Sequence, residues 1–483
     1  MKDAISKSGY RKLKLLNYLL FSEDRVQKKY LAGRLGISVP TLETYVQEIN
    51  EDLEDFVFIS NEDKRYCLTR RQDINFDTLT AFMIKHSFSF DIIIATFHGQ
   101  EKTVNAWLEE RFISRTSFYG RLKELDNLLA RSHLILEKNP IFIAGNELNI
   151  RFFYIHVLAK AFPITGWIIQ DFSNKDFEPF IQKLEQELGI YFSPSTRVEY
   201  AISLGVMLTR FKQGKLVQLD AYQRKYWQEA VRYFQLPQFD FSDLEKLIDK
   251  PIPELELYLL FLSHFLVPFT YYDRKKIAER LSQEVVYLKP LRHLVETLVN
   301  FFFHDKPYNT EMLKVYLLNF LVRFVFVGKI TDLLDINYFS KKISPVTFSK
   351  ARIDEKVNRL LKNTDFGILK NNRATIAQYT FDLFNVFMLD KQKIAQLTIK
   401  IVAKNGSIWE EYLKMILSKR YPANAITFSN DLESKEHLPQ YDLIISDFPI
   451  ENNYGCPLLT WNFPPTKKEL EGLELFLKQK EGR

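Results

Sequence analysis

Residues 113–131 read Ile-Ser-Arg-Thr-Ser-Phe-Tyr-Gly-Arg-Leu-Lys-Glu-Leu-Asp-Asn-Leu-Leu-Ala-Arg and have the pattern of an amphipathic helix. Large apolar residues recur at helical period, which predicts that one face is buried: Phe118, Leu122, Leu125 and Leu129. Ser114 or Thr116 can cap this helix, because a hydroxyl oxygen accepts one of the unpaired backbone N–H groups at its start. The outer faces carry cations and hydroxyl groups that suit phosphates and base edges: Arg115, Ser117, Tyr119, Arg121 and Lys123. We interpret this stretch as a DNA recognition helix, although ordinary solvated helices can start with the same residue types.

The same pattern occurs 76 residues earlier, with Ile37 in the place of Ile113. At that offset the inward positions stay apolar while the outward ones change: Leu42, Val46, Ile49 and Leu53 correspond to Phe118, Leu122, Leu125 and Leu129. Strand-like pairs follow both copies, since Phe58-Ile59 corresponds to Leu134-Ile135 and Tyr66 to Phe142. The repeat predicts two tandem winged helix-turn-helix domains, residues 1–72 and 73–150, which is typical of nucleic-acid binding. A small helical domain with a hairpin is the alternative for either copy.

The first copy shows the expected order of elements. A helix with Leu13, Leu16, Leu19 and Leu20 on its apolar face precedes a second helix at Ala32. Gly36-Ile37-Ser38 makes a tight turn into a third helix, Thr41 to Asp55. Residues 56–59 and 65–68 then form a hairpin around the polar turn at 61–64, which we predict to be the wing.

The two recognition helices differ in charge. Residues 41–55 hold no Lys or Arg but six acidic residues: Glu43, Glu48, Glu51, Asp52, Glu54 and Asp55. The cations of this copy flank the helix: Arg11, Lys12, Lys14, Lys28, Lys29, Arg34, Lys64, Arg65, Arg70 and Arg71. An acidic helix is repelled by phosphates, although Thr41, Thr44 and Gln47 near its start can reach a groove. We predict that the second copy dominates DNA affinity, and that the first contacts the backbone or packs on a partner.

The rest of the chain divides into helical and α/β parts. Residues 150–390 are helical in pattern, and a weaker repeat relates 199–215 to 311–329, with Arg323 following Arg210 by 113 residues. This predicts two helical-bundle domains, 151–280 and 281–392. From residue 393 to 483, apolar strands at 397–402, 426–428, 442–446 and 458–461 alternate with helices at 408–417 and 467–478, which predicts a small α/β sandwich with a parallel sheet. The fold class is therefore mainly α and multidomain.

Composition and motif content argue against membrane, metal-binding and enzymatic functions. The chain has 483 residues, a formal charge of +6, and two cysteines, Cys67 and Cys456, without a ligand pattern around either. Neither a signal peptide nor a bilayer-spanning run is evident, so we expect a cytoplasmic protein with no membrane partner. The eight histidines show no metal-ligand spacing, and no nucleophile–base set or phosphate-binding glycine loop is evident. We expect neither an enzyme, a metal site nor a cofactor.

The order of these parts resembles the Mga/AtxA-type virulence regulators of Gram-positive bacteria. The most specific string is residues 143–151, in which Gly145, Glu147 and Arg151 match the Gly-x-Glu-x-x-x-Arg junction of that family. The resemblance implies a transcriptional regulator whose helical domains are similar to PTS regulation domains (PRDs), which phosphocarrier proteins of the sugar phosphotransferase system modify on histidine. It also implies that the C-terminal domain is EIIB-like and mediates self-association as a homodimer or higher oligomer.

The chain departs from that family at its expected phosphate acceptors. Seven residues before Arg210 and Arg323, where the family commonly has histidine, stand Ser203 and Tyr316. After the strand at 397–402, residues 403–407 contain no cysteine, so phosphotransfer by this domain is not expected. The candidates left for phosphorylation are His264, His293 and His304. A hydrogen-bonding role in the core or on the surface is the alternative for each.

We therefore expect a DNA-binding global transcriptional regulator tuned by sugar phosphotransferase signalling and by dimerisation. The residues expected to contact promoter DNA are Arg115, Thr116, Ser117, Tyr119, Arg121 and Lys123, with Thr41, Thr44 and Gln47 in the first copy. The second wing, at Glu137-Lys138-Asn139, is expected to follow the backbone. An RNA-binding antiterminator with the same regulatory domains is the main alternative. A phosphocarrier-type enzyme is disfavoured because it needs an acceptor after the first C-terminal strand.

Overall fold

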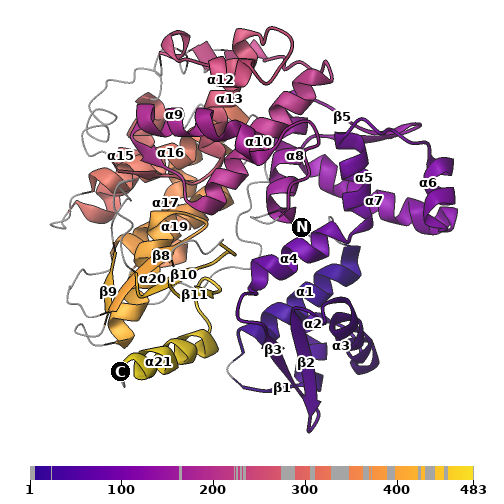
Figure 1. The fold of residues 1–483 in the computed structure, drawn as a ribbon, viewed down its shortest axis with the longest axis vertical. Helices are drawn as coiled ribbons and strands as arrows, with labels where there is room; N and C mark the ends of the chain where they lie inside the picture. Colours follow the sequence, from indigo (N-terminus) through magenta and orange to yellow (C-terminus); the bar gives the residue numbers. More distant parts are fainter. Residues whose placement is uncertain are drawn as a thin grey trace.

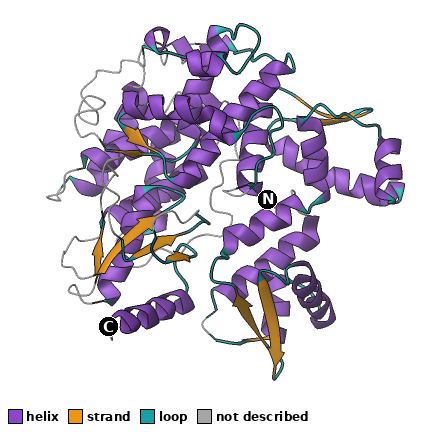
Figure 2. Ribbon diagram, in the orientation of Figure 1, coloured by secondary structure: helices purple, strands orange, loops and turns teal. Residues whose placement is uncertain are grey.

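The structure is a computed structural model of the chain. It describes residues 6–22, 24–162, 166–221, 223–224, 227–228, 231, 235–272, 289–304, 310–327, 348–362, 369–370, 372–388, 397–421, 426–429, 441–450 and 455–481. The described part is mainly helical, with small antiparallel sheets and one parallel sheet near the C-terminus (Figure 2). The prediction of a mainly helical chain that ends in a parallel sheet is confirmed.

The N-terminal elements are α1 (Ser6–Leu20), β1 (Val26–Gln27), α2 (Lys28–Leu35), α3 (Val39–Asp52), β2 (Val57–Glu62) and β3 (Arg65–Arg70). The strands form an antiparallel sheet in the order β1-β3-β2. Gly36 ends α2 in the left-handed conformation, with φ 64°, and Ser38 caps α3. All four apolar residues predicted to face inward from α3 are buried: Leu42, Val46, Ile49 and Leu53. The sequence prediction missed β1, which has only two residues.

The next elements are α4 (Phe76–Lys85), α5 (Phe88–Phe97), α6 (Val104–Arg111), α7 (Arg115–Arg131), β4 (Ile135–Lys138) and β5 (Ile141–Ala144). The observed helices keep the 76-residue offset of the sequence repeat. Helix α6 lies 76 positions after α2, and α7 begins 76 positions after α3 begins. The β2–β3 turn corresponds in the same way to the β4–β5 turn. In Figure 1 the α1–α3 and α5–α7 segments form two lobes on one side of the molecule.

No single helix in the described ranges is long and apolar enough to cross a membrane. The helices α4 and α5 pass the length and composition test only as a pair, and they are bent by 71° at their junction. Their apolar residues lie in the protein core, among them Leu79, Ile84, Phe90 and Ile93.

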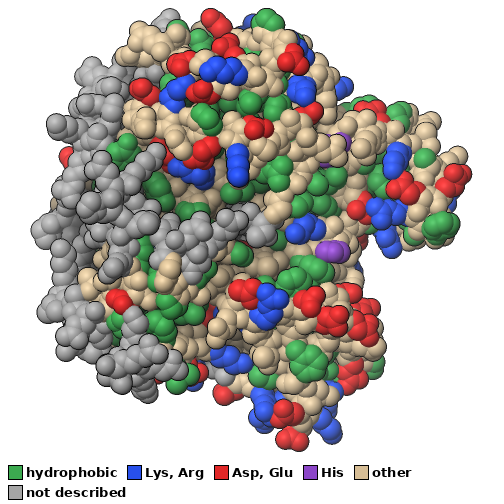
Figure 3. Space-filling view, in the orientation of Figure 1, with side chains coloured by type: hydrophobic (Ala, Val, Ile, Leu, Met, Phe, Trp, Pro, Cys, Tyr) green, Lys and Arg blue, Asp and Glu red, His purple; other side chains and the backbone are tan. Residues whose placement is uncertain are grey.

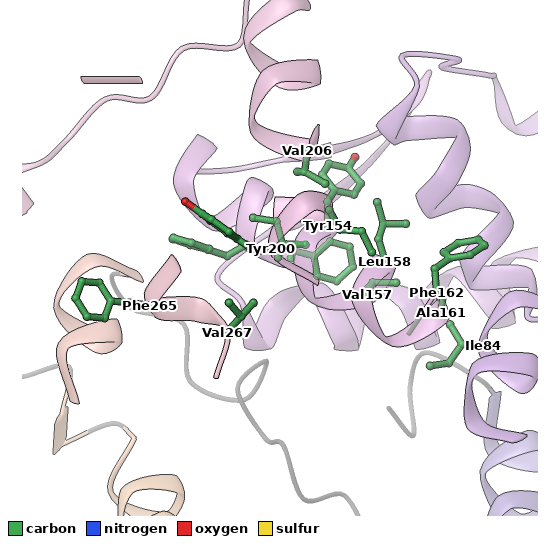
Figure 4. Close-up of a cluster of buried hydrophobic side chains, with 14 of the residues drawn as sticks. Ile84, Tyr154, Val157, Leu158, Ala161, Phe162, Tyr200, Val206, Phe265 and Val267 are labelled. Atoms are coloured by element: carbon green, nitrogen blue, oxygen red, sulfur yellow. The ribbon is translucent and has the colours of Figure 1, made fainter. Parts of the chain in front are cut away.

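The helix α8 (Glu147–Ala161) connects the second lobe to the helical part, and the boundary predicted at residue 150 falls within it. Figure 4 shows Tyr154 and Leu158 of α8 packed with Val206 of α10 (Pro194–Lys212), and Ala161 next to Ile84 of α4.

The other described helices of this part are η1 (Asn174–Phe177), α9 (Glu178–Leu188), η2 (Leu236–Gln238), α12 (Ser242–Glu245), α13 (Glu254–Leu262), η3 (Ser263–Leu266), α15 (Lys289–Phe303), α16 (Glu311–Val327), α17 (Lys350–Lys362) and α19 (Arg373–Phe387). Strands β6 (Ile190–Tyr191) and β7 (Thr270–Tyr271) pair with each other. The domain boundaries predicted at 280 and 392 lie outside the described residues.

A buried cluster of charges joins α8 to the helical part. Arg151 is fully buried and binds Glu256 of α13 with both terminal nitrogens, at 3.0 Å for Nη2. Its Nε donates to Glu147 Oε1 at 3.2 Å. The Glu147 carboxylate also accepts from Nε and Nη2 of Arg210, at 2.9 and 2.7 Å. The Gly-x-Glu-x-x-x-Arg string of the sequence therefore supplies two members of a four-residue ionic cluster.

The C-terminal sheet is parallel throughout, in the order β11-β10-β8-β9. Its strands are β8 (Leu397–Val402), β9 (Ile426–Phe428), β10 (Leu443–Ser446) and β11 (Leu458–Thr460), with helices α20 (Ser407–Arg420) and α21 (Lys467–Glu481). Each strand was predicted from its apolar run, to within a residue at its ends.

This C-terminal part packs on the segment between β3 and α4. Asn75 caps α4 and donates to the backbone oxygens of Asp447 and Trp461, and Phe76 N donates to Asn462 Oδ1 at 2.7 Å. Arg70 forms an ion pair with Glu469, which is 5% exposed. The C-terminal part is therefore in direct contact with the segment that follows the first lobe.

Candidate nucleic-acid interface

The first turn of α7 presents its polar side chains to solvent. Ser114 caps the helix, because its Oγ accepts from Ser117 N at 3.2 Å, and it is thus Ser114 rather than Thr116 that fills this role. The apolar face is buried as predicted: Phe118, Leu122, Leu125 and Leu129. All six residues expected to contact DNA from this helix are exposed: Arg115, Thr116, Ser117, Tyr119, Arg121 and Lys123.

Neighbouring elements hold Arg115 and Arg121 of α7 without neutralising them. Arg115 Nη2 donates to Asn105 Oδ1 of α6 at 2.7 Å, and the Arg121 guanidinium lies over the Phe88 ring at 5.2 Å. Neither arginine forms an ion pair with a carboxylate in the part of the chain that the structure describes. An exposed guanidinium that is oriented but uncompensated is well suited to a phosphate or to a guanine edge.

Phe112 forms the turn that leads into α7. It ends α6 in the left-handed conformation, with φ 49°, and 95% of its surface is exposed. The first copy has Gly36 at the corresponding position, with φ 64°. A residue with a Cβ is strained in this conformation. Periodicity alone does not indicate this feature, but aligning the two copies does.

An ion pair joins the β4–β5 hairpin to α7. Lys138 of β4 forms an ion pair with Asp126 of α7 at 3.1 Å, so only part of its charge remains available to a backbone phosphate. Glu137, Lys138 and Asn139 are all exposed, as expected for a wing. In the first copy the residue that corresponds to Asp126 is Asn50, which binds the backbone N and O of Ile59 at 2.7 and 3.0 Å. The same helix position anchors the hairpin in both copies.

The recognition helix of the first copy carries its acidic residues on the surface, where Figure 3 shows acidic side chains gathered over α3. Thr44 and Gln47 are exposed and Thr41 is partly exposed, but each makes a local hydrogen bond. Thr41 binds the Ser38 hydroxyl at 2.8 Å, Thr44 donates to Pro40 O at 3.2 Å, and Gln47 donates to Glu51 at 2.8 Å.

Several cations that we expected to flank this helix are already paired within the chain. Lys28 binds Glu43 at 2.7 Å, and Lys12 binds Glu48 and Asp52 at 3.0 and 3.1 Å. Arg70 binds Glu469, and Arg71 pairs with Asp73 at 2.5 Å. The sequence shows that these cations flank the helix, but it does not show which of them are paired with carboxylates.

The three histidines considered for phosphorylation differ in access. His264 lies in η3, is fully buried, and shares a hydrogen bond with Phe261 O at 2.7 Å among phenylalanine rings. His293 of α15 and His304, which follows α15, are exposed. An imidazole must reach solvent to accept phosphate from another protein, so the two exposed histidines are the accessible candidates.

Comparisons with known proteins agree with this arrangement. Residues 72–158 match the Mga helix-turn-helix domain family, and they include α4 to α7, the β4–β5 hairpin and most of α8. The capsule synthesis positive regulator AcpB of Bacillus anthracis is 24% identical, with 84% of each chain covered. The capsule synthesis positive regulator AcpA is 22% identical over 85% of this chain and 86% of the relative. The anthrax toxin expression trans-acting positive regulator of the same organism is 18% identical over 98% of both chains. The family match and these relatives, which together cover most of the chain, support the Mga/AtxA regulator family.

Proposed function

We propose that this protein is a DNA-binding transcriptional regulator that reads promoter DNA mainly through the start of α7. The observation that carries the proposal is the exposed first turn of α7, in which Arg115 and Arg121 are oriented but lack an ion-pair partner among the described residues. Residues 1–72 and 73–150 serve as tandem winged helix-turn-helix domains. The names of the relatives, which are positive regulators of capsule and toxin expression, support activation of transcription.

The side chains in contact with DNA have different roles. Arg115, Arg121 and Lys123 neutralise phosphates or bind base edges, while Thr116, Ser117 and Tyr119 donate hydrogen bonds. In the first copy, Thr41, Thr44 and Gln47 give weaker contacts, because the surrounding carboxylates repel phosphates and Lys12 and Lys28 are already paired.

The test replaces Arg115 and Arg121 together by alanine in the full-length protein. We expect weaker binding to promoter DNA, and a slope of log K against log salt that is smaller by about 2, since each lost phosphate contact removes about 1. Fluorescence anisotropy over a salt series measures both quantities. The matched control, Arg359→Ala with Lys362→Ala on α17, removes the same charge from exposed positions away from α7 and should leave binding unchanged.

Two further measurements test which helix makes the main contact and which nucleic acid is bound. Thr41→Ala with Gln47→Ala should weaken binding less than the α7 variant, and a larger effect would move the main contact to α3. A hairpin RNA used as competitor distinguishes this function from that of an antiterminator. Preference for the RNA over duplex DNA would contradict the proposal.

For regulation, we propose that residues 151–280 and 281–392 act as PRD-like sensory domains and that the EIIB-like part, 393–483, mediates self-association. The ionic cluster of Glu147, Arg151, Arg210 and Glu256 supports coupling, because it ties the helix that follows the second DNA lobe to the helical part. Phosphorylation adds about two negative charges to a histidine, which can reset a helix interface.

The expected acceptors are His293 and His304, with buried His264 modified only if η3 opens. Incubation of the full-length protein with phosphocarrier proteins, followed by mass spectrometry under conditions that preserve phosphohistidine, should locate the label on the exposed histidines. The His293→Ala and His304→Ala double variant should lose it. Absence of any label in the unmodified protein would contradict regulation by this route while leaving the DNA contact intact.

A further inference from the structure

A pocket lies between the helical part and the C-terminal sheet, away from the two DNA lobes. Its walls come from α16, α19, the segment between η3 and β7, and the loop between β8 and α20. Figure 1 shows α19 next to β8 and α20, at the place where these parts meet. The pocket has a cavity volume of about 90 Å³ and opens to solvent at its mouth.

Arg323 of α16 is a cation in the wall of this pocket. It is 7% exposed, its guanidinium lies over the Phe320 ring at 4.7 Å, and its Nε has no hydrogen-bond partner within the described ranges. Burial lowers the pKa of Arg323, which means that its charged form is poorly solvated. The Glu199 carboxylate favours the charged form of Arg323 through space, but Arg323 forms no ion pair among the described residues. An anion in the pocket would supply a direct partner and offset the cost of burying the guanidinium.

The first helical repeat provides an internal comparison. Arg210 precedes Arg323 by 113 residues and occupies the corresponding place near the end of its helix. Glu147 neutralises Arg210 through two hydrogen bonds, at 2.9 and 2.7 Å. Among the residues that the structure describes, no carboxylate forms a hydrogen bond or ion pair with Arg323, and Glu199 acts on it only through space. The chain therefore compensates one arginine internally and leaves the other beside an open pocket.

The start of α20 lines the same pocket. This helix has 14 residues, and its N-cap is Gly406, with φ 86° and no side-chain cap. Asn405, Gly406 and Ser407 all belong to the pocket wall. The first backbone N–H groups of a helix lack acceptors within it and, together with the helix dipole, favour an anion. The pocket thus combines a buried guanidinium that forms no ion pair among the described residues with a helix N-terminus.

The remaining walls suit a carbon skeleton that carries hydroxyl groups. Tyr379 is stacked on Phe320, and Trp409 adds a further aromatic surface. Gln378 and Asp382, which are 2.9 Å apart as donor and acceptor, supply amide and carboxylate groups that can bind hydroxyls. We propose that this pocket binds a small hydroxyl-bearing organic anion, with its phosphate or carboxylate between Arg323 and the start of α20. The proposal goes beyond DNA binding and does not rest on it.

The test is isothermal titration calorimetry of the full-length protein with glucose 6-phosphate, gluconate, inorganic phosphate and glucose. We expect saturable binding of at least one of the two organic anions and none of glucose. Preference for glucose 6-phosphate assigns a phosphate, and preference for gluconate assigns a carboxylate. Saturable binding of none of the four probes, or equal affinity for glucose, would overturn the proposal. Equal affinity for inorganic phosphate and glucose 6-phosphate would overturn the requirement for hydroxyl groups.

Two variants change the charge of the site by independent routes. Arg323→Gln removes the cation, and Ser407→Asp places a carboxylate in the first turn of α20, where it favours the helix but repels the ligand. Each should weaken binding about tenfold or more, since hydrogen bonds to charged groups contribute that much. Arg292→Gln on α15, which removes an exposed ion pair with Glu296, should leave binding unchanged. Unchanged affinity in both site variants, with circular dichroism showing that they are folded, would place the ligand elsewhere.

Discussion

At the residue scale, Arg151 stabilises the junction between the second lobe and the helical part. It is fully buried, and three groups satisfy it: Glu147, Glu256 and the backbone oxygen of Lys215 at 2.8 Å. A buried guanidinium tolerates this position only because carboxylates surround it. In the sequence, Glu147 and Arg151 are visible as a spaced pair, whereas Glu256 stands 105 residues after Arg151 and is not indicated by any pattern.

We expect Glu256→Gln to destabilise the protein by about 3 kcal/mol, because breaking a buried ion pair leaves one charge uncompensated. Urea unfolding followed by circular dichroism measures the free energy of unfolding. The control is Glu355→Gln, which breaks an ion pair with Arg359 in which both side chains are about two-thirds exposed. Exposed pairs contribute little, so the control should be as stable as the parent protein. Equal stability of all three proteins would show that the cluster does not hold the junction.

At the scale of elements, the two copies of the repeat differ at the turn that precedes α3 in one copy and α7 in the other. Gly36 adopts the left-handed conformation without strain, whereas Phe112 adopts it with a Cβ and with 95% of its surface exposed. The Phe112 side chain therefore gains little from burial in this structure while its backbone is strained.

We expect Phe112→Gly to be more stable than Phe112→Ala by about 1 kcal/mol, because only glycine removes the steric cost of the left-handed conformation. Both variants lose the aromatic ring, so the comparison isolates the backbone. Thermal unfolding of the two proteins gives the difference as a shift in Tm. An alanine variant that is the more stable of the two would mean that the turn relaxes to another conformation.

Sequence was sufficient for elements with strong local patterns. The apolar period predicted α3, α7 and the four C-terminal strands, and the offset of 76 predicted the equivalence of the two lobes. It failed where structure depends on partners distant in the chain. The two-residue strand β1 exists only because Val26 pairs with Tyr66, and the state of Lys12 or Arg70 depends on carboxylates that periodicity does not locate. The exposure of the α7 residues was predictable, whereas the absence of neutralising partners was not.

At the scale of the whole molecule, the C-terminal part packs on the segment that joins the first lobe to α4. Asn462 links them: its Oδ1 accepts from Phe76 N at 2.7 Å, and its Nδ2 donates to Glu469 at 3.0 Å. Glu469 in turn pairs with Arg70 at the end of β3. The Arg70 side chain is therefore only 15% exposed. This contact joins the C-terminal part directly to the first lobe, in addition to the connection through α8.

We expect Asn462→Ala to loosen this contact, because it removes the hydrogen bond between Phe76 N and Asn462 Oδ1 at the start of α4. Amide hydrogen exchange should quicken over residues 70–80, and the free energy of unfolding should fall by about 1 kcal/mol, the net contribution of an ordinary hydrogen bond. Arg420→Gln is the matched control: it breaks an ion pair with Glu474 between α20 and α21, within the C-terminal part, and should leave exchange at 70–80 unchanged. If neither variant altered exchange at residues 70–80, the contact between Asn462 and Phe76 would not restrain this segment. If both did so equally, the effect would come from loosening the C-terminal part as a whole rather than from the contact that Asn462 makes.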